Sequence, residues 1–379
     1  MASRTMETIS RSGLKNLILS DSAHITNVKS VSSYSWIDTP TPTIAVPGSP
    51  SLWSPPVTDF QLSQDSGLYN IAENMVRMDP DSPLAPILSA AFTTNPSFDF
   101  GSISVITDGN NIRKLLSFIS PGSSRDISEP FTIQLELARN TLLMCRHETA
   151  ATEYIGPHEF RGYRHEFKKA FTTRQIDGSA GHFRIISYRF DGMEFLTRHE
   201  TDGFVSPSKQ AEYAQSGLAD RSGFETRPLI KEDAAPALKS GYLQRVTVLQ
   251  KGKTIPLESI LEIKTRALTR SLHFAEVAPQ LWVSQTPKLV RAYHDKGCFR
   301  KQQVEDMSDE IQQWERENQG DLRILGALIE RIITLMTGCC GRGTLRYDVA
   351  TASLIISAND GASNMLPEDL YYDVPFIMY

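Results

Sequence analysis

Hydrophobic and polar positions alternate most regularly between residues 182 and 202, where the sequence is HFRIISYRF, then DG, then MEFLTRHETD. Alternation with a period of two is typical of a β-strand that buries one face. Asp191 and Gly192 separate the two runs and favour a tight turn, so the segment is predicted to form a β-hairpin. Shorter strands are predicted at 103–106, 131–143, 245–249 and 261–265, as two strands around Pro287 within 280–293, and as a closing hairpin at 345–349 and 354–357.

Helical spacing marks three other segments. In residues 110–119 the apolar positions recur at i, i+3, i+4 and i+7, as on one face of a helix. Residues 157–171 are predicted to form a helix or a turn followed by a helix, and residues 306–337 a helix broken at Gly320. These elements interleave without a regular strand–helix–strand rhythm. The predicted fold is therefore mixed α/β (α+β), with a central mixed β-sheet flanked by helices.

The N-terminal part has a different composition. The first 30 residues are polar with scattered apolar positions and are predicted to be mobile or weakly helical. Residues 40–56 contain six prolines, which disfavour helix and regular sheet, and Trp36 and Trp53 flank them. We interpret this region as an extended Pro-rich arm that the two tryptophans hold on the domain surface. The alternative is a proline-rich ligand for a partner protein.

The length of 379 residues allows two or three domains at roughly 150 residues each. The candidate motifs, however, are spread from Gly162 to Gln285, which favours one catalytic domain. We therefore predict an N-terminal arm at residues 1–59 and a single domain at residues 60–379. Residues 206–240 are polar and are predicted to form a surface insertion in that domain.

Composition and charge narrow the class of protein. Lys and Arg number 39 against 44 Asp and Glu, and the formal net charge of −5 excludes the chain-wide basic surface of non-specific duplex binders. A local basic groove remains compatible with this charge, because residues 161–174 hold five basic residues and one acidic residue. The four cysteines are too few and too scattered for a disulfide scaffold and indicate a reducing compartment.

The sequence predicts neither export nor membrane insertion. Its N-terminus has no long apolar run of the kind that signal peptides contain. No segment reaches the ~20 apolar residues that are needed to span a bilayer. We therefore expect a protein of the nucleus or cytoplasm, with no membrane partner.

An acidic pair and an acid–lysine pair on predicted strands indicate a site for chemistry. Glu200 and Asp202 lie two residues apart at the end of the hairpin, so their carboxylates point the same way, and Glu262 and Lys264 have the same spacing. If these strands pair, three carboxylates and one ammonium converge. Mg²⁺ or Mn²⁺ relieves the repulsion among clustered carboxylates, and Lys264 then faces the scissile phosphate.

Acid–x–Lys on a strand, with an acidic residue upstream, is the pattern of the PD-(D/E)xK nuclease fold. The alternative is that these residues are surface charges on a half-exposed sheet. Several motifs in a common order make the chain resemble the decapping exoribonucleases (DXO-like), whose core is of this type. The resemblance covers about residues 106–299, and its motifs are Gly162-Tyr163-Arg164-His165-Glu166, Glu200-Thr201-Asp202, Glu262-Ile263-Lys264, Trp282-Val283-Ser284-Gln285, and Pro287-Lys288-Leu289-Val290 followed by Tyr293.

The resemblance implies a metal-dependent hydrolase of RNA 5′ ends that acts by decapping, pyrophosphohydrolysis or 5′–3′ digestion. It implies that Lys264 and Gln285 position the water or the phosphate. The expected ligands of the metal, taken to be two Mg²⁺ or Mn²⁺ ions, are Glu166, Glu200, Asp202, Glu262 and the backbone carbonyl of Ile263. The bases expected to bind RNA are Arg161, Arg164, Lys168, Lys169, Arg184 and Arg198.

The chain departs from the family pattern in three places, one of which is a spacing between Gln285 and Pro287 that is shorter than the family pattern. The family has an arginine early, in a strand-to-helix element that resembles residues 106–116, and here its position falls on Gly109. Arg113, one helical turn further on, is the nearest base. The spacing from Asp202 to Glu262 is also long, at 60 residues. The loss of the arginine puts the handling of the RNA 5′ end in question.

The stretch SYSWIDTPTPTIAVPGSP, with IGPHEFRG and LEIKTR, also resembles a group of filamentous-fungal proteins, some of which are named as prenyl-diphosphate synthases. Such synthases need two aspartate-rich DDxxD motifs on facing helices to bind Mg²⁺-diphosphate. This chain contains no Asp-Asp pair, so its residues do not support that name.

Other classes of site find little support in the sequence. Neither HxxxH nor a His–Cys spacing indicates zinc, and the GxSxG elbow of hydrolases is missing. The chain also lacks GxxxxGK[ST] and a strand-linked GxGxxG, which disfavours P-loop and Rossmann chemistry. The main alternative is a catalytically inactive RNA-binding or scaffold protein on the nuclease fold, which the Gly109 departure favours.

Overall fold

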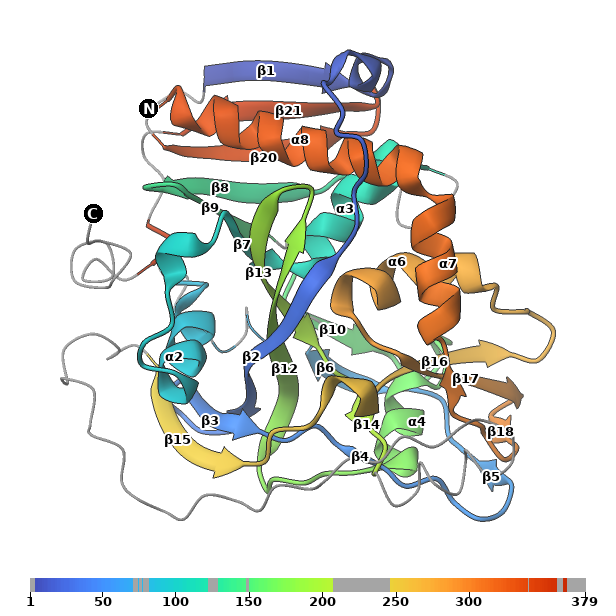
Figure 1. Ribbon diagram of the computed structural model, residues 1–379. Helices are drawn as coiled ribbons and strands as arrows, with labels where there is room; N and C mark the ends of the chain where they lie inside the picture. Colours follow the sequence, from blue (N-terminus) through green and yellow to red (C-terminus); the bar gives the residue numbers. More distant parts are fainter. Residues whose placement is uncertain are drawn as a thin grey trace.

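The computed structural model describes residues 4–70, 74, 77, 82–121, 129–147, 150–206, 246–339, 341–359 and 364–366. Within these residues, the largest sheet has 11 strands and mixes parallel and antiparallel pairs (Figure 1). In spatial order its strands are β1 (Arg4–Ser10), β21 (Ser353–Ala358), β20 (Arg342–Asp348), β8 (Thr132–Ala138), β9 (Thr141–His147), β7 (Val105–Asp108), β13 (Met193–Glu200), β12 (Ser179–Phe190), β2 (Thr26–Ile37), β3 (Thr43–Gly48) and β15 (Thr247–Gly252).

A second sheet lies beside the first and contains short strands around a parallel pair, β16 and β17. Its strands are β11 (Thr172–Thr173), β4 (Leu52–Trp53), β14 (Gly203–Phe204), β16 (Ile260–Ala267), β17 (Lys288–Asp295), β18 (Cys298–Phe299) and β5 (Phe60–Gln61), with β19 (Glu305–Asp306) paired to β17. A separate pair joins β6 (Gly67–Asn70) to β10 (Thr152–Ile155).

Helices cover both sheets, and in Figure 1 α3 and α8 lie along the large sheet while α4 lies against the second one. The helices are α2 (Ala85–Thr94), α3 (Gly109–Ile119), α4 (Arg164–Phe171), α6 (Phe274–Ser284), α7 (Ser308–Glu317) and α8 (Gln319–Thr337), with short 3-10 turns at Arg11–Asn16, Phe100–Ser102 and Leu257–Ser259. The largest hydrophobic core lies between the 11-stranded sheet and α3, α6, α7 and α8, and a second core packs α2 on the other strands. The predicted mixed α/β class with helices around a mixed sheet is confirmed.

The predicted hairpin at 182–202 is confirmed as β12 and β13. Phe190 pairs with Met193, and the two residues between them, Asp191 and Gly192, have φ values of 49° and 80°. Two positive φ values match a type I′ turn, whose twist fits the two strands. The closing hairpin is confirmed as β20 and β21, and the helix at 110–119 as α3.

Three predicted elements have different bounds or a different type. Residues 280–293 form the end of α6 followed by β17, and not two strands around Pro287, because the apolar positions before 284 follow helical spacing. Residues 131–143 form two strands, β8 and β9, that turn at Arg139. The long C-terminal helix is divided at Asn318, and not at Gly320, into α7 and α8.

The N-terminal region is not an arm. The first 30 residues include β1, which pairs with β21, and the start of β2, which pairs with β12. Between the prolines, Ile44 and Ala45 are fully buried in β3, which pairs with β2 and β15. Four apolar or β-branched residues from Thr43 to Val46 therefore suffice for a strand, since the prolines stand outside its antiparallel pairing with β2.

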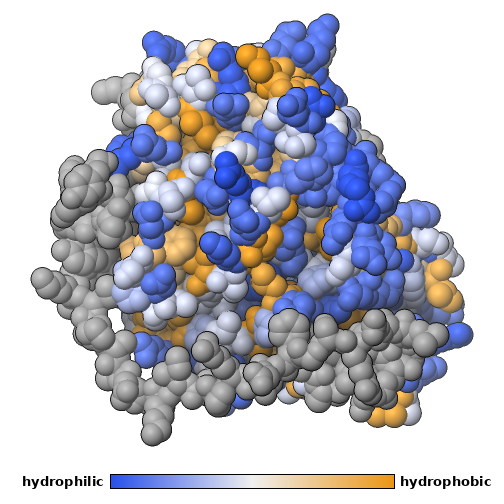
Figure 2. All heavy atoms as spheres, viewed as in Figure 1, coloured by the Kyte–Doolittle hydropathy of each residue, from blue (hydrophilic) through white to orange (hydrophobic). Residues whose placement is uncertain are grey.

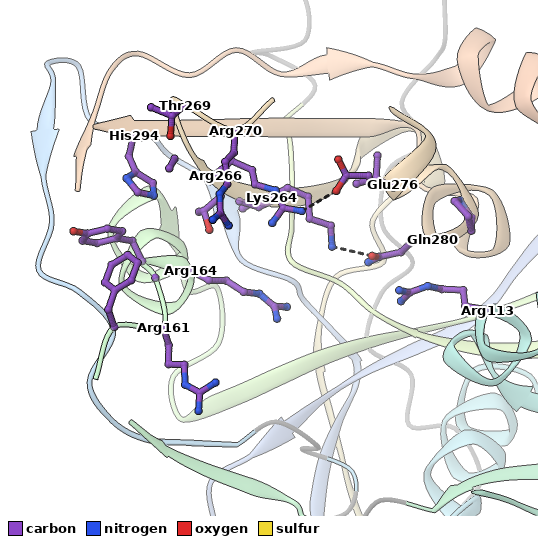
Figure 3. A pocket seen from close by; sticks show the side chains of 18 of the residues that line it. Arg113, Arg161, Arg164, Lys264, Arg266, Thr269, Arg270, Glu276, Gln280 and His294 are labelled. Atoms are coloured by element: carbon purple, nitrogen blue, oxygen red, sulfur yellow. Dashed lines mark hydrogen bonds and ion pairs between the residues drawn. The ribbon is translucent and has the colours of Figure 1, made fainter. Parts of the chain in front are cut away.

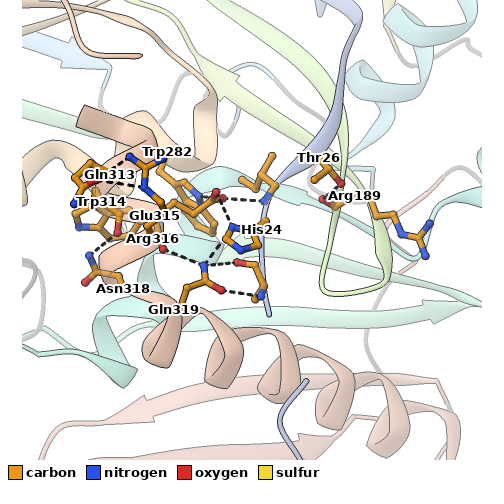
Figure 4. Close-up of polar contacts among 12 residues, drawn as sticks. His24, Thr26, Arg189, Trp282, Gln313, Trp314, Glu315, Arg316, Asn318 and Gln319 are labelled. Carbon is orange, nitrogen blue, oxygen red and sulfur yellow. Dashed lines mark hydrogen bonds and ion pairs between the residues drawn. The ribbon is translucent and has the colours of Figure 1, made fainter. Parts of the chain in front are cut away.

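Side chains of α7 and α8 hold the chain between β1 and β2 in place, and Trp282 of α6 supports one of them, as Figure 4 shows. Glu315 Oε1 accepts hydrogen bonds from the backbone N–H of Ile25 and from Trp282 Nε1, both at 2.8 Å. His24 Nδ1 lies 3.1 Å from Glu315 Oε2, and Gln319 bonds both backbone groups of Ala23. These contacts explain why a polar segment is ordered here.

Both tryptophans that flank the proline-rich stretch are core residues. Trp36 is fully buried in the second core, and Trp53 is fully buried in a third core together with Phe167, Phe171 and Phe299. On the face of the molecule seen in Figure 2, hydrophilic side chains dominate around α7 on the right-hand side, and hydrophobic ones appear as separate groups. No helix among the residues described is long and apolar enough to cross a membrane. The predicted insertion at 206–240 lies, but for Ser206, outside the described residues.

Candidate active site

The candidate site lies where the chain passes from the large sheet to the second sheet. β13 ends at Glu200, and Asp202 immediately precedes β14. Because β14 pairs antiparallel with β16, with Gly203 opposite Leu261, Asp202 comes to lie beside Glu262. Asp202 Oδ2 accepts a hydrogen bond of 2.9 Å from the backbone N–H of Ile263, which joins the two strands at this point. The predicted pairing of the two acidic strand ends is therefore present.

Asp202 and Glu262 are both buried, each with 6% of its surface exposed. Burial would raise the pKa of Asp202, but the charges of Lys168, Arg164 and Lys264 hold it well below its ordinary value. The pKa of Glu262 is raised, first by burial and then by the negative charge of Asp202, although Lys264 opposes this shift. Of the two carboxyls, Asp202 is therefore the one that is held firmly ionised.

Two lysines contact these carboxylates from different elements. Lys264, on β16, places Nζ 2.8 Å from Glu262 Oε1. Lys168, on α4, places Nζ 2.6 Å from Asp202 Oδ1 and 3.8 Å from Glu200 Oε1. Burial would lower the pKa of Lys168, but the charges of Asp202 and Glu200 raise it, so this lysine remains an ammonium ion.

Helix α4 presents bases to the cluster, and its acidic residue faces elsewhere. Phe167 is buried in the third core, and the residues before and after it, Glu166 and Lys168, lie on opposite flanks of the helix. Arg164, four residues before Lys168, shares its flank. Burial would lower the pKa of Arg164, but the charges of Asp202, Glu200 and Glu262 raise it.

Glu166 was predicted to contribute to the metal site, and the structure does not bring it into the carboxylate cluster. Its ion pair is with Lys169, at 3.9 Å between Oε1 and Nζ. The rotation of α4 has a cause outside the helix, because the buried Asp65 accepts hydrogen bonds from the backbone N–H groups of His165 and Glu166. This side chain caps the helix and sets which flank meets the cluster.

Within the described residues, no three His, Cys, Asp or Glu side chains lie close enough together to hold a metal ion. Two buried carboxylates do lie side by side, and an ammonium ion already sits against Asp202. A cation position therefore exists, and the oxygen donors around it are of the type that Mg²⁺ and Mn²⁺ prefer. The acidic side chains that could hold such an ion are those of Asp202 and Glu262, with Glu200 at the half-exposed edge.

A large basic cavity of about 890 Å³ opens beside these residues (Figure 3). In Figure 3 the side chains of Arg113, Arg164 and Lys264 point toward a common space, although they come from α3, α4 and β16. The cavity also contains one acidic residue, Glu276, which pairs with Arg266 at 3.2 Å. The basic residues that line it are Arg113, Arg161, Arg164, Lys264, Arg266 and Arg270.

The glutamine that reaches the site is Gln280, and not the predicted Gln285. Gln280 Oε1 accepts a hydrogen bond of 2.8 Å from Lys264 Nζ. Gln285 ends α6 with a left-handed backbone, and its side chain donates to the carbonyl of Trp282. Helical spacing could have identified Gln280, because it lies four residues after Glu276 and therefore on the same flank of α6.

The six bases predicted to bind RNA lie in different environments. Arg161 and Arg164 line the cavity, Lys168 pairs with Asp202, and Lys169, also on α4, is largely exposed. Arg198 and Arg184 are buried and are not available to a nucleic acid. Arg198 makes a bidentate ion pair with Asp108, with N–O distances of 2.6 and 2.9 Å.

Arg184 holds the site together from behind. Its side chain donates to Thr201 Oγ1 at 3.1 Å, to the carbonyl of Ser284 at 3.0 Å and to Thr286 Oγ1 at 2.8 Å. Burial lowers its pKa to about 10, while the charge of Glu262 opposes that shift. Arg184 therefore ties the Glu200-Thr201-Asp202 segment to the turn after α6, which is a structural role.

The glycine at position 109 has a structural explanation. A Cβ atom added to Gly109 would lie 2.2 Å from Cε1 of His199, so the imidazole fills the space of a side chain there. His199 is buried and its Nε2 lies 2.8 Å from Thr197 Oγ1. Burial, together with Arg184 and Arg113, holds the pKa of His199 well below its ordinary value, so the ring is neutral. The predicted nearest base, Arg113, does line the cavity.

Comparisons with known proteins show what the chain resembles. A family model described as "Domain of unknown function (DUF8563)" matches residues 10–362. A search of curated proteins found no match.

Solved structures share the fold over nearly the whole chain. Scheffersomyces stipitis Rai1, in complex with (3′-NADP)⁺ and calcium ion, is 12% identical with a TM-score of 0.56, over 97% of this chain and 99% of that chain. Candida albicans Rai1, in complex with pU5-Mn²⁺, is 12% identical with a TM-score of 0.53, over 98% of each chain. K. lactis Dxo1, in complex with manganese, is 10% identical with a TM-score of 0.50, over 93% of this chain and 98% of that chain. The fold implied by the decapping-exoribonuclease resemblance is confirmed.

Proposed function

We propose that this chain, which belongs to the family described as DUF8563, is a divalent-metal-dependent hydrolase of phosphate bonds at RNA 5′ ends. The observation that supports this most strongly is the placement of Asp202 and Glu262 side by side on paired strand ends, with Lys264 beside them at a basic cavity. Two acids and a lysine in this arrangement are the minimum that the PD-(D/E)xK pattern requires.

In this proposal the residues have separate tasks. Asp202 and Glu262 hold the cation, and the hydrogen bond from Ile263 to Asp202 fixes the direction of one carboxylate. Lys264, held between Glu262 and Gln280, orients the attacking water or the phosphate and offsets negative charge as the reaction proceeds. A divalent ion supplies Lewis-acid activation of the phosphate and lowers the pKa of bound water.

The choice of RNA as substrate rests on charge and on the shared fold. The cavity has six basic side chains and one acidic one, which suits a phosphate-rich ligand. Candida albicans Rai1, which has the same fold, was crystallised with pU5 and Mn²⁺. Removal of a cap, release of pyrophosphate and 5′–3′ digestion all begin with binding of the RNA 5′ end, and the cavity suits each of them.

A second candidate is an RNA-binding protein without catalysis. The observation that favours it is that the described residues bring no third acidic side chain close enough to complete a metal site, while Lys168 already pairs with Asp202 at 2.6 Å. On this alternative the same cavity binds RNA, and the ion pairs of the carboxylate cluster serve stability alone.

One experiment separates the two candidates. RNAs with 5′-monophosphate, 5′-triphosphate and capped ends are incubated with the protein in Mg²⁺, Mn²⁺ or EDTA, and products and binding are both measured. We expect cleavage that EDTA abolishes and that the double variant Asp202→Asn with Glu262→Gln lacks. Glu305→Gln, which alters a carboxylate paired with Arg291 away from the cluster, is the matched control and should cleave normally.

Cleavage that persists in EDTA or in the double variant contradicts the metal–carboxylate proposal. RNA binding with no cleavage of any substrate favours the second candidate.

A further inference from the structure

The ammonium group of Lys168 occupies the space between two acids of the carboxylate cluster. Its ammonium group lies 2.6 Å from Asp202 Oδ1 and 3.8 Å from Glu200 Oε1, so it bridges the two acids of the Glu200-Thr201-Asp202 motif. Only 25% of its side chain is exposed, against 4% for that of Asp202. Two cations cannot share this position, because like charges repel strongly where water is largely excluded.

The cluster is also electrically balanced without a metal. The carboxylates of Glu200, Asp202 and Glu262 together carry three negative charges when ionised. The cations that act on them include Arg164, Lys168 and Lys264, and the buried Arg184 behind Glu262 adds a further positive charge, so positive charge at least equals negative charge. The repulsion that would draw in a divalent ion is therefore already relieved, and an added ion leaves an excess of positive charge in a buried place.

A phosphate-bearing ligand changes this balance. Arg164 lines the basic cavity and also interacts with Asp202, so the cavity and the cluster share one cation. A phosphate in the cavity gives Arg164 a second anionic partner, and Lys168 lies on the same flank of α4, four residues on. The flexible stem of a lysine allows its ammonium to leave Asp202 once other anions are within reach.

We propose that Lys168 is a resident counter-cation which a divalent ion must displace, so that the protein binds Mg²⁺ or Mn²⁺ tightly only when a phosphate-bearing RNA end is bound as well. This inference rests on the proposed function, since it concerns the same cation position. It makes metal loading conditional on substrate. By thermodynamic linkage, the metal must strengthen RNA binding by the factor by which RNA strengthens metal binding.

The test measures Mn²⁺ binding directly, by electron paramagnetic resonance of free Mn²⁺ and by calorimetry, without reference to cleavage. The wild-type protein is compared with Lys168→Gln and Lys168→Arg, each alone and with a phosphorothioate 5′-phosphorylated oligouridylate that resists hydrolysis. The matched control is Lys288→Gln, because Lys288 is also a mostly buried lysine paired with an aspartate, Asp306, but lies on β17 outside the cluster.

We expect Lys168→Gln to bind Mn²⁺ roughly tenfold or more tightly than the wild type in the absence of RNA. Lys168→Arg and Lys288→Gln should bind as weakly as the wild type. The oligouridylate should tighten Mn²⁺ binding by the wild type roughly tenfold and have a much smaller effect on Lys168→Gln.

Tight Mn²⁺ binding by the wild type without RNA, unchanged in Lys168→Gln, would overturn the inference. Mn²⁺ binding that follows the expected order, with no RNA cleavage by any of the proteins, would retain the inference and overturn the hydrolase proposal. Absence of Mn²⁺ binding in every protein and condition would overturn both. Lys168→Arg, which preserves the positive charge, distinguishes loss of the counter-cation from a general disturbance of α4.

Discussion

On the strand side of the carboxylate cluster, the residues before β14 and those of β16 supply Asp202 and Glu262, whereas on the helix side α4 supplies Arg164 and Lys168. The strand side agrees with the prediction from the motifs, and the helix side reverses it, because Glu166 had been expected to face the acids. The strand side therefore contributes the acids together with Lys264, and the helix side contributes bases.

The difference follows from the geometry of the two kinds of element. Side chains of a strand alternate between two faces, so residues two apart must share a face once the strands are paired. A helix can be rotated about its axis, and residues on either flank of a buried stripe compete for one contact. Phe167 fixes the buried stripe of α4, and Asp65 caps the helix with Lys168 toward the cluster and Glu166 away from it.

The largest expected effect is on the strand side. Asp202→Asn removes the ionised carboxylate of the cluster while it preserves the shape of the side chain. We expect RNA cleavage to fall by roughly 10²–10³-fold, as for removal of one electrostatic group from a hydrolytic site. Single-turnover rates with saturating RNA measure this. A loss smaller than tenfold would mean that Asp202 does not hold the cation.

The next effect is on the helix side. Lys168→Glu gives α4 an acidic residue in place of the base, so that four carboxylates face two cations. We expect the unfolding free energy in EDTA to fall by roughly 2 kcal/mol and to recover when Mn²⁺ is added. Thermal unfolding with and without Mn²⁺ measures both changes. Equal melting temperatures in EDTA and Mn²⁺ would show that acidity on this side creates no metal site.

A smaller effect concerns Glu262 and pH. Its pKa in the folded protein is raised, so its contribution to stability is full below its unfolded pKa of about 4.3 and is lost as the pH rises through the folded value. Glu262→Gln should therefore gain stability relative to the wild type as the pH rises above about 4.3.

Asp202 should behave in the opposite way. Its folded pKa is lowered, so its contribution to stability is present above about pH 3.9 and is lost below it, as the pH falls through the folded value.

Urea unfolding of Glu262→Gln and of the wild type at pH 4, 5.5 and 7 measures the trend predicted for Glu262. A stability difference that is constant across these pH values would contradict the assignment of the raised pKa.

The smallest effect is expected at Glu166. Because its carboxylate is part-exposed and pairs only loosely with Lys169, Glu166→Gln should change cleavage by less than about twofold and stability by less than about 0.5 kcal/mol. Comparison with Asp202→Asn in one assay completes the contrast between the two sides. A large loss of activity would bring Glu166 back among the metal-binding candidates.

Several sequence predictions failed where a residue's neighbours come from distant parts of the chain. Arg184 and Arg198 looked like bases on an exposed hairpin, but β2 and β7 pair on either side of β12 and β13 and bury them. The family motif indicated Gln285, whereas the glutamine that bonds Lys264 is Gln280, on the preceding part of α6. The prolines around β3 led to the prediction of an extended arm, although the apolar residues between them are enough to form a strand.

By itself the sequence determined the β12–β13 hairpin and the helix α3, because each depends on local periodicity. The convergence of Asp202 with Glu262 was predicted only if their strands pair, and the pairing of β14 with β16 supplies that condition. Only the tertiary structure decided which flank of α4 meets those acids. That choice depends on the cap from Asp65, about 100 residues away in sequence, and on the burial of Phe167. Packing between distant segments therefore sets whether a basic or an acidic side chain of α4 faces the acids, and no local pattern encodes that choice.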